Sequence, residues 1–169
     1  MVVAVTTIQI AREVKGVKNI QEIAPGLDNA GDPLAEVATG GQPKEEHLQR
    51  LAEAGYRTVV DLRTLGESPH PDEWGMIVRS AGLEYVNIPV GHEDIDDETF
   101  DRFRELMRDG GRRPVLVHCS SANRVGALLI PYLILDEGMT PEKVSAIAAE
   151  VGLRSNRLER AALRYVSAK

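Results

Sequence analysis

Apolar residues along the chain form two alternating patterns, which predict strands that alternate with helices. Short, mostly apolar runs typical of buried strands occupy residues 56–62, 83–90 and 114–118. Apolar side chains at helical spacing occupy residues 43–55, 74–80, 99–108, 125–137 and 154–167, and a further helix begins at residue 140. This alternation is typical of an α/β protein, so we expect one domain with a central, mostly parallel sheet flanked by helices.

Individual residues predict where several helices begin, bend or end. Pro43 suits the first position of a helix, and Gly55 suits its end. Thr140 followed by Pro141 is the pattern of an N-cap and a first helical residue. Pro131 lies inside an apolar helical stretch, where the missing N–H predicts a kink.

The first part of the chain carries the weakest pattern. We expect a helix or a strand up to about Lys15 and a loop over residues 24–33, which are rich in Pro, Gly and Asp. The apolar start has no basic region before it and no small-residue cleavage site after it, so we do not expect a signal peptide. We therefore divide the chain into an N-terminal extension, residues 1–37, and a catalytic domain, residues 38–169.

The composition and net charge of the chain limit which partners it can bind. The chain has 169 residues, of which 43% are hydrophobic and 27% charged, as in ordinary globular proteins, and its formal net charge is −6. Such a charge argues against nucleic acid and anionic membranes as partners. The longest apolar run, residues 125–135, is too short to cross a bilayer. One cysteine excludes an intramolecular disulfide and fits the reducing cytoplasm, where we expect the protein.

The single cysteine lies where chemistry is favoured. Cys119 stands between the strand at 114–118 and the helix from 125, and Arg124 follows five positions later. A loop that leads into a helix N-terminus points several N–H groups at one place, which favours a thiolate and binds an oxyanion. Arg124 adds a guanidinium to the same place. The alternative is that Cys119 is a small buried hydrophobic residue.

Several motifs resemble the cysteine-dependent phosphatases, the superfamily of dual-specificity and protein tyrosine phosphatases. His118-Cys119 followed by Arg124-Val125-Gly126 is similar to their signature loop. Residues 38–160 also resemble the bacterial beta-lactamase-hydrolase-like branch of this superfamily. The stretches that carry this resemblance are 41–43, 58–63 together with Glu67, and 88–90. The resemblance implies a dual-specificity-phosphatase-like fold without a cofactor.

The resemblance also implies roles for individual residues. Cys119 would be the nucleophile and Arg124 would hold the anion, while His118 would steady the loop. The anion would lie against the backbone N–H groups of the loop residues Ser120, Ser121, Ala122, Asn123 and Arg124.

The chain departs from the phosphatase pattern in two ways. Only four residues separate Cys119 from Arg124, whereas phosphatases have five and rhodanese-type sulfurtransferases have a comparably short loop. Val125 stands where phosphatases carry a hydroxyl that assists the departing thiolate, and valine has no such donor.

Phosphatases also need an acid for the leaving group, and we choose Asp94 from a run that also holds His92, Glu93, Asp96 and Asp97. Asp96 or Asp97 can instead cap the following helix, and the remaining side chains can face water.

Asp61 and Arg63 end a strand beside the cysteine loop. They either orient Arg124 or enlarge the positive field at the site, or they form a salt bridge that only pins the cysteine loop, and we favour the salt bridge. No spacing of residues indicates a metal site.

Three hypotheses follow. The preferred one is sulfur transfer, in which Cys119 takes sulfur from thiosulfate or a persulfide and passes it to glutathione or another thiol. The alternative is hydrolysis of phosphomonoesters or phosphotyrosine through a cysteinyl-phosphate. The third is a phosphate-binding module without catalysis.

Overall fold

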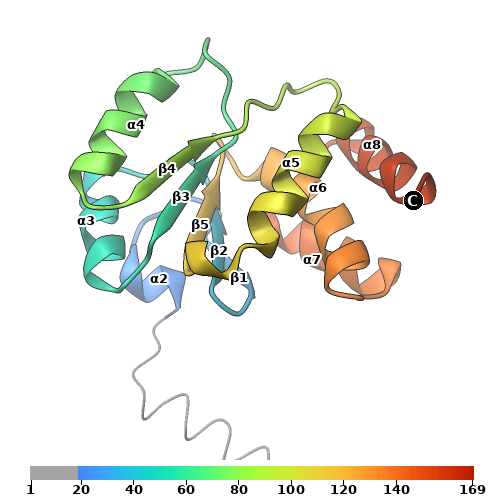
Figure 1. Cartoon of the computed structure of the whole chain (residues 1–169), viewed down its shortest axis with the longest axis horizontal. Helices are drawn as coiled ribbons and strands as arrows, with labels where there is room; N and C mark the ends of the chain where they lie inside the picture. The colour runs from blue at the N-terminus through green and yellow to red at the C-terminus, as the bar shows by residue number, and fades with distance from the viewer. Residues whose placement is uncertain (1–18) are drawn as a thin grey trace, which may run out of the picture.

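Five short strands form one mixed sheet whose order is β1-β2-β5-β3-β4 (Figure 1). The computed structural model describes residues 19–169. The strands are β1 (Gly31–Leu34), β2 (Val37–Gly40), β3 (Thr58–Asp61), β4 (Glu84–Asn87) and β5 (Val115–His118). Strands β2, β5, β3 and β4 are parallel, and β1 is antiparallel to β2. The predicted α/β fold with a mostly parallel sheet is confirmed.

Helices cover both faces of the sheet. One layer contains α2 (Ile20–Ile23), α3 (Glu45–Glu53) and α4 (Pro71–Ser80), and the other contains α5 (Asp97–Arg108), α6 (Asn123–Pro131), α7 (Pro141–Val151) and α8 (Asn156–Ser167). Consecutive strand residues face opposite layers. Val59 and Leu116 pack against the first layer, while Val60 and Val117 pack against the second. Both cores are therefore built on the same four-residue strands.

The register of the parallel strands brings three strand ends to one edge of the sheet. His118 at the end of β5 lies opposite Asp61 at the end of β3, and Asp61 lies opposite Asn87 at the end of β4. The loops that follow these strands therefore meet at this edge, which is where open α/β sheets bind their ligands.

The structure corrects the prediction for residues 24–33. The end of this stretch enters the edge strand β1, which pairs with β2, so residues 31–34 and Val37 belong to the sheet and residues 35–36 form the turn between the two strands. Pro33 concealed the strand, although a proline is tolerated on an edge where one N–H faces no partner. The predicted element up to Lys15 lies outside the described residues.

Two helix predictions also need correction at their ends. Pro43 does not begin a helix, because α3 starts at Glu45 with Lys44 as its N-cap. The predicted single helix at 125–137 is α6 followed by a π-helical turn, η2 (Tyr132–Asp136). The backbone bonding of α6 changes directly after Pro131, which has no N–H to donate. Thr140, in contrast, caps α7 as predicted, since its hydroxyl accepts from the N–H of Lys143.

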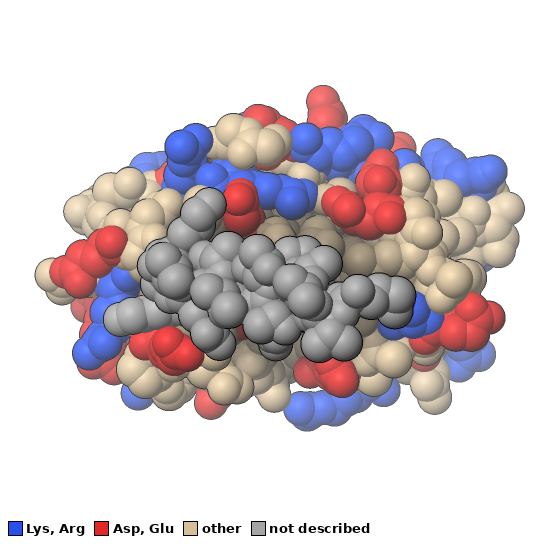
Figure 2. Space-filling view, turned by 90° about the horizontal axis from the view of Figure 1, so that it is seen from below, with Lys and Arg blue, Asp and Glu red and all other residues tan. Residues whose placement is uncertain are grey.

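The charged surface is mixed. Seen from below, positive and negative side chains of the described residues are interspersed on the visible part of the face (Figure 2). Within residues 19–169, no helix combines the length and the apolar character that crossing a bilayer requires.

Gly126 lets α6 approach the end of α7 closely. A Cβ atom at this position would lie 2.7 Å from Leu153 Cβ and 2.9 Å from the carbonyl oxygen of Ala148. We expect Gly126→Ala to destabilise the protein, because overpacking costs about 1–3 kcal/mol and exceeds the gain in helix propensity. Chemical denaturation measures the change, and Gly110→Ala is the control, since its Cβ would meet no atom within 4 Å. Equal stability of the two variants would contradict the close contact.

Candidate active site

Cys119 lies at the turn from β5 into α6 and is fully buried. The neighbouring backbone is held on both sides: the N–H of Leu62 donates to the carbonyl oxygen of His118 at 2.9 Å, and the N–H of Cys119 donates to that of Gly40 at 3.4 Å. These bonds continue the sheet ladder up to the cysteine. The thiol therefore has a fixed position at the carboxyl edge of the sheet.

The loop after Cys119 turns its carbonyl groups outward. The carbonyl oxygen of Ser120 accepts from the N–H of Gln42 at 3.0 Å, and that of Ser121 accepts from the side-chain amide of Asn29 at 2.8 Å. Gly41 must be small here, because a Cβ atom would lie 2.7 Å from the Ser120 carbonyl oxygen. These contacts hold the loop from outside.

The N–H groups of the same loop have no acceptor among residues 19–169. This holds for the five consecutive residues 120–124, and Ala122 adopts the left-handed conformation at φ 71° directly before α6. Unpaired N–H groups at the start of a nine-residue helix form a binding site for an oxyanion. The loop residues predicted to line a cradle are thus brought together around Cys119.

Arg124 is the cation of this cradle, and it is 1% exposed. Its Nη1 donates to Glu67 Oε2 at 2.8 Å and to the carbonyl oxygen of Val90 at 2.9 Å, and its Nη2 donates to Glu67 Oε1 at 2.6 Å. Glu67 therefore occupies the Nη1–Nη2 edge of the guanidinium. The Nε–Nη2 edge keeps two N–H groups that have no oxygen acceptor in the described part of the chain, and this edge can bind an anion.

The charge of Arg124 is stabilised by its neighbours. Burial lowers the pKa of the guanidinium, but the hydrogen bonds that Arg124 donates to Glu67 and the negative charge of the nearby Cys119 outweigh this effect, so the net pKa is raised. Conversely, the hydrogen bond from Arg124 lowers the pKa of Glu67 to about 2 against the effect of burial. Both groups are therefore ionised at neutral pH.

Asp61 and Arg63 pair with each other and hold the loop that carries Glu67. Arg63 donates to both carboxylate oxygens of Asp61, at 3.0 and 2.9 Å, and its Nη1 donates to the carbonyl oxygen of Pro69 at 2.6 Å. Tyr85 donates to the same carboxylate at 2.7 Å. The pair thus pins residues 64–69 beside Arg124.

His118 is buried beside Cys119 and is held by two contacts. Trp74 Nε1 donates to His118 Nε2 at 3.1 Å, so Nδ1 carries the hydrogen and lies 3.2 Å from the carbonyl oxygen of Cys119. Burial lowers the pKa of His118 to about 4, although Asp61 counteracts the shift. The imidazole is therefore neutral at physiological pH and steadies the loop backbone as a hydrogen-bonding group.

The acidic run after β4 divides into three environments. Asp96 caps α5, since its carboxylate accepts from the N–H and the hydroxyl of Thr99. Asp94 accepts from the N–H of Ile95 and from Arg164 of α8, at 2.9 and 3.4 Å. His92 lies with Nε2 3.9 Å from Glu67. The start of this loop thus lies beside Arg124, while Asp94 is drawn toward α8.

Comparison with known sequences identifies the family. Residues 14–163 match the protein family described as "DSP-PTPase phosphatase fused to NAD+ Kinase". The chain belongs to this phosphatase family. The expected membership of the cysteine-dependent phosphatase superfamily is therefore confirmed, and the family covers most of the described structure.

Relatives of this phosphatase family agree with the narrower resemblance. The Beta-lactamase hydrolase-like protein of Xylella fastidiosa strain 9a5c is 31% identical over 134 residues, which are 75% of this chain and 31% of that protein. Probable NAD kinase 2, chloroplastic, from Oryza sativa subsp. japonica is 35% identical over 98 residues, 54% of this chain and 10% of that protein. The chain thus spans at most about a third of these curated relatives.

A solved structure supports the fold of the family. The crystal structure of a phosphatase candidate from Shewanella putrefaciens CN-32 superimposes with a TM-score of 0.73 and 27% sequence identity. The match covers 88% of this chain and 97% of that one. The layers and strand order described above are therefore those of a phosphatase-like domain.

Sequence reasoning missed three side chains that build the site. Glu67 binds Arg124, Trp74 donates to His118, and Asn123 Oδ1 accepts from the N–H groups of Arg154 and Ser155. Each of these contacts joins residues far apart in the sequence, and no local spacing reveals them. Residues 19–169 contain no cluster of three His, Cys, Asp or Glu side chains suited to a metal ion.

The burial of neutral His118 predicts a pH-dependent stability. Below its usual pKa of 6.5 the unfolded chain binds a proton that the folded chain excludes until about pH 4, so stability falls as the pH drops through this window. The total loss from this residue is about 3 kcal/mol. We expect His118→Gln to flatten the slope of unfolding free energy against pH between 6.5 and 4, and exposed His92→Gln to retain it. An unchanged slope in His118→Gln would contradict the assignment.

The bidentate contact from Glu67 predicts that this residue positions Arg124. We expect Glu67→Gln to lower kcat/KM by about 10- to 100-fold, because a small displacement of a charged group in a site has effects of this size. Affinity for vanadate, measured by inhibition, should fall with it. Glu73→Gln, an exposed residue of α4, is the control. If both variants retain the same vanadate affinity, Glu67 does not position the arginine.

Proposed function

We propose that this domain hydrolyses phosphate monoesters through a cysteinyl-phosphate intermediate on Cys119. The observation that carries the proposal is the row of N–H groups beside the thiol that have no acceptor among residues 19–169, together with the Nε–Nη2 edge of Arg124, which has no oxygen acceptor there. This arrangement offers hydrogen-bond donors to several oxygens of one phosphoryl group. Membership of the phosphatase family supports the proposal, so it replaces sulfur transfer as the preferred function.

The reaction follows from the geometry in two steps. The Cys119 thiolate attacks phosphorus, the bond to the ester oxygen breaks, and an acid protonates the leaving oxygen. Water then attacks the phosphorus and gives a proton to the acid, which the first step left ionised, and the sulfur leaves as the thiolate with release of phosphate. In both steps negative charge on the phosphoryl oxygens is stabilised by Arg124 and the loop N–H groups.

The acid comes from the loop between β4 and α5, and Asp94 is the residue we propose. Its carboxylate is not used as a helix cap, in contrast to Asp96, and it lies four residues after Val90, whose carbonyl oxygen contacts Arg124. The ion pair between Asp94 and Arg164 joins two exposed side chains, and such pairs contribute little to stability. Little free energy is therefore needed to move Asp94 toward the phosphoryl site.

Sulfur transfer is a second candidate that two features of the sequence favour. The four-residue spacing between Cys119 and Arg124 is short, and Val125, which is fully buried, offers no hydroxyl to the departing thiolate. A thiolate that attacks the outer sulfur of thiosulfate needs no acid, because sulfite leaves as an anion. The resulting persulfide would then be discharged by glutathione or a similar thiol.

The two reactions make different demands on Asp94. We expect Cys119→Ser to abolish turnover of phenyl phosphate, and Asp94→Asn to lower it by about 10²–10⁴-fold, since removal of a general acid has this effect. The loss in Asp94→Asn should be smaller with p-nitrophenyl phosphate, whose leaving group needs less protonation. Asp72→Asn on the opposite layer is the matched control.

Intact mass spectrometry separates the candidates directly. The wild-type protein is incubated with thiosulfate and, separately, with phenyl phosphate. Phosphate release without a sulfur adduct supports the proposal. A gain of one sulfur on Cys119 that glutathione removes, without phosphate release, would overturn it in favour of sulfur transfer. Phosphate binding with neither reaction would leave a module that binds phosphate without catalysis.

A further inference from the structure

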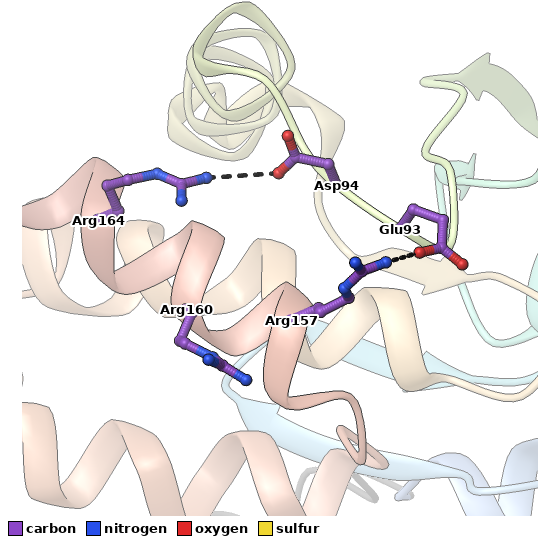
Figure 3. Close-up of a pocket in the computed structure, with 5 residues that line it drawn as sticks. All are labelled: Glu93, Asp94, Arg157, Arg160 and Arg164. Atoms are coloured by element: carbon purple, nitrogen blue, oxygen red, sulfur yellow. Dashed lines mark hydrogen bonds and ion pairs between the residues drawn. The ribbon is translucent and has the colours of Figure 1, made fainter.

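A cluster of arginines lies beside the proposed phosphatase site on α8. Arg157, Arg160 and Arg164 are three or four residues apart, so they share one side of the helix. Glu93 and Asp94, from the loop before α5, complete the walls of a groove of about 380 Å³ (Figure 3). The groove therefore holds three cations and two anions.

The arginines are only partly neutralised. Arg157 pairs with Glu93 and Arg164 pairs with Asp94, as Figure 3 shows, while Arg160 donates to the carbonyl oxygen of Asn156 at 3.3 Å. The paired side chains are between 68% and 79% exposed, so water screens these ion pairs and little free energy is needed to break them. A ligand of higher charge can replace the two carboxylates.

Both walls of the groove are joined to the phosphate cradle. The carboxylate wall begins three residues after Val90, whose carbonyl oxygen accepts from Arg124. The arginine wall begins two residues after Ser155, whose N–H donates to Asn123 Oδ1 in the cradle loop at 3.2 Å. Both walls of the groove therefore lie on segments that contact Arg124 or the cradle loop.

We propose that Arg157, Arg160 and Arg164 form a second anion subsite, and that the substrate is a small molecule with two or more phosphoryl groups. The inference rests on the proposed phosphatase function and adds its substrate class. One phosphoryl group lies in the cradle at Cys119, and a second displaces Glu93 and Asp94 from the arginines. Displacement also frees the Asp94 carboxylate for its role as acid.

The net charge of the chain is negative, so a polyanionic substrate needs a local group of cations to bind. The formal net charge is −6, and the run from Glu93 to Asp97 adds negative charge at the entrance, which repels a polyanion. Guanidinium groups bind phosphoryl oxygens with two parallel hydrogen bonds. The local cluster on α8 thus supplies the attraction that the rest of the surface does not.

The test compares tripolyphosphate with inorganic phosphate on the full chain carrying Cys119→Ser, by titration calorimetry. We expect tripolyphosphate to bind at least about tenfold more tightly, a difference of about 1.4 kcal/mol. Adding Arg157→Gln with Arg160→Gln should reduce the ratio of the two affinities to nearly one. Arg50→Gln, an exposed arginine of α3 on the other face of the sheet, is the control and should leave the ratio unchanged.

A variant that is expected to tighten binding shows that the effects do not come from a damaged fold, which would weaken binding. Glu93→Gln removes a competing carboxylate, so it should tighten tripolyphosphate binding by about threefold. The proposal is wrong if tripolyphosphate binds no tighter than phosphate, or if the arginine variants leave the ratio unchanged. Turnover of phenyl phosphate by the wild-type protein is measured separately, so a failed subsite and a failed phosphatase function give different results.

Discussion

The buried guanidinium of Arg124 is the group on which the site depends. An unpaired buried charge is costly, so the fold must surround it with acceptors. Glu67, the carbonyl oxygen of Val90 and the nearby Cys119 meet this need, and they come from loops after three different strands. These loops meet because β5, β3 and β4 are parallel neighbours whose ends lie at one edge. The sheet topology therefore supplies the partners that a buried charge at Arg124 needs.

A second set of buried polar contacts keeps the first in place. Asp61 binds Arg63, which holds the loop of Glu67 through the carbonyl oxygen of Pro69. On the same side of the sheet, Trp74 of α4 fixes the neutral tautomer of His118, whose ring contacts the Cys119 carbonyl group. Hydrogen-bonded groups in a low-dielectric interior are expensive to separate. Cys119 and Arg124 are thereby held in fixed positions by the fold itself.

Local patterns predicted much of this arrangement. Strands β3, β4 and β5 and the helices after them were predictable, because a run of apolar residues or an apolar repeat at helical spacing is a pattern among residues that are close in the sequence. Capping by Thr140 was predictable for the same reason. Strand β1 was not, because the proline and aspartate in it oppose strand formation and its pairing with β2 decides the outcome. The π-helical turn after Pro131 likewise depends on how the helix packs.

Neighbouring residues alone predict the α/β alternation, the family resemblance and the position of Cys119 and Arg124 between a strand and a helix, since each depends on local order. The contact of Glu67 with Arg124 across 57 positions, and that of Asp94 with Arg164 across 70 while Asp96 caps α5, emerge only from the folded chain. Folding also brings the start of α8, the helix with three arginines along one side, into contact with Asn123 of the cysteine loop. Ion pairs between distant residues arise from the packing of whole elements, so no spacing within one segment encodes them.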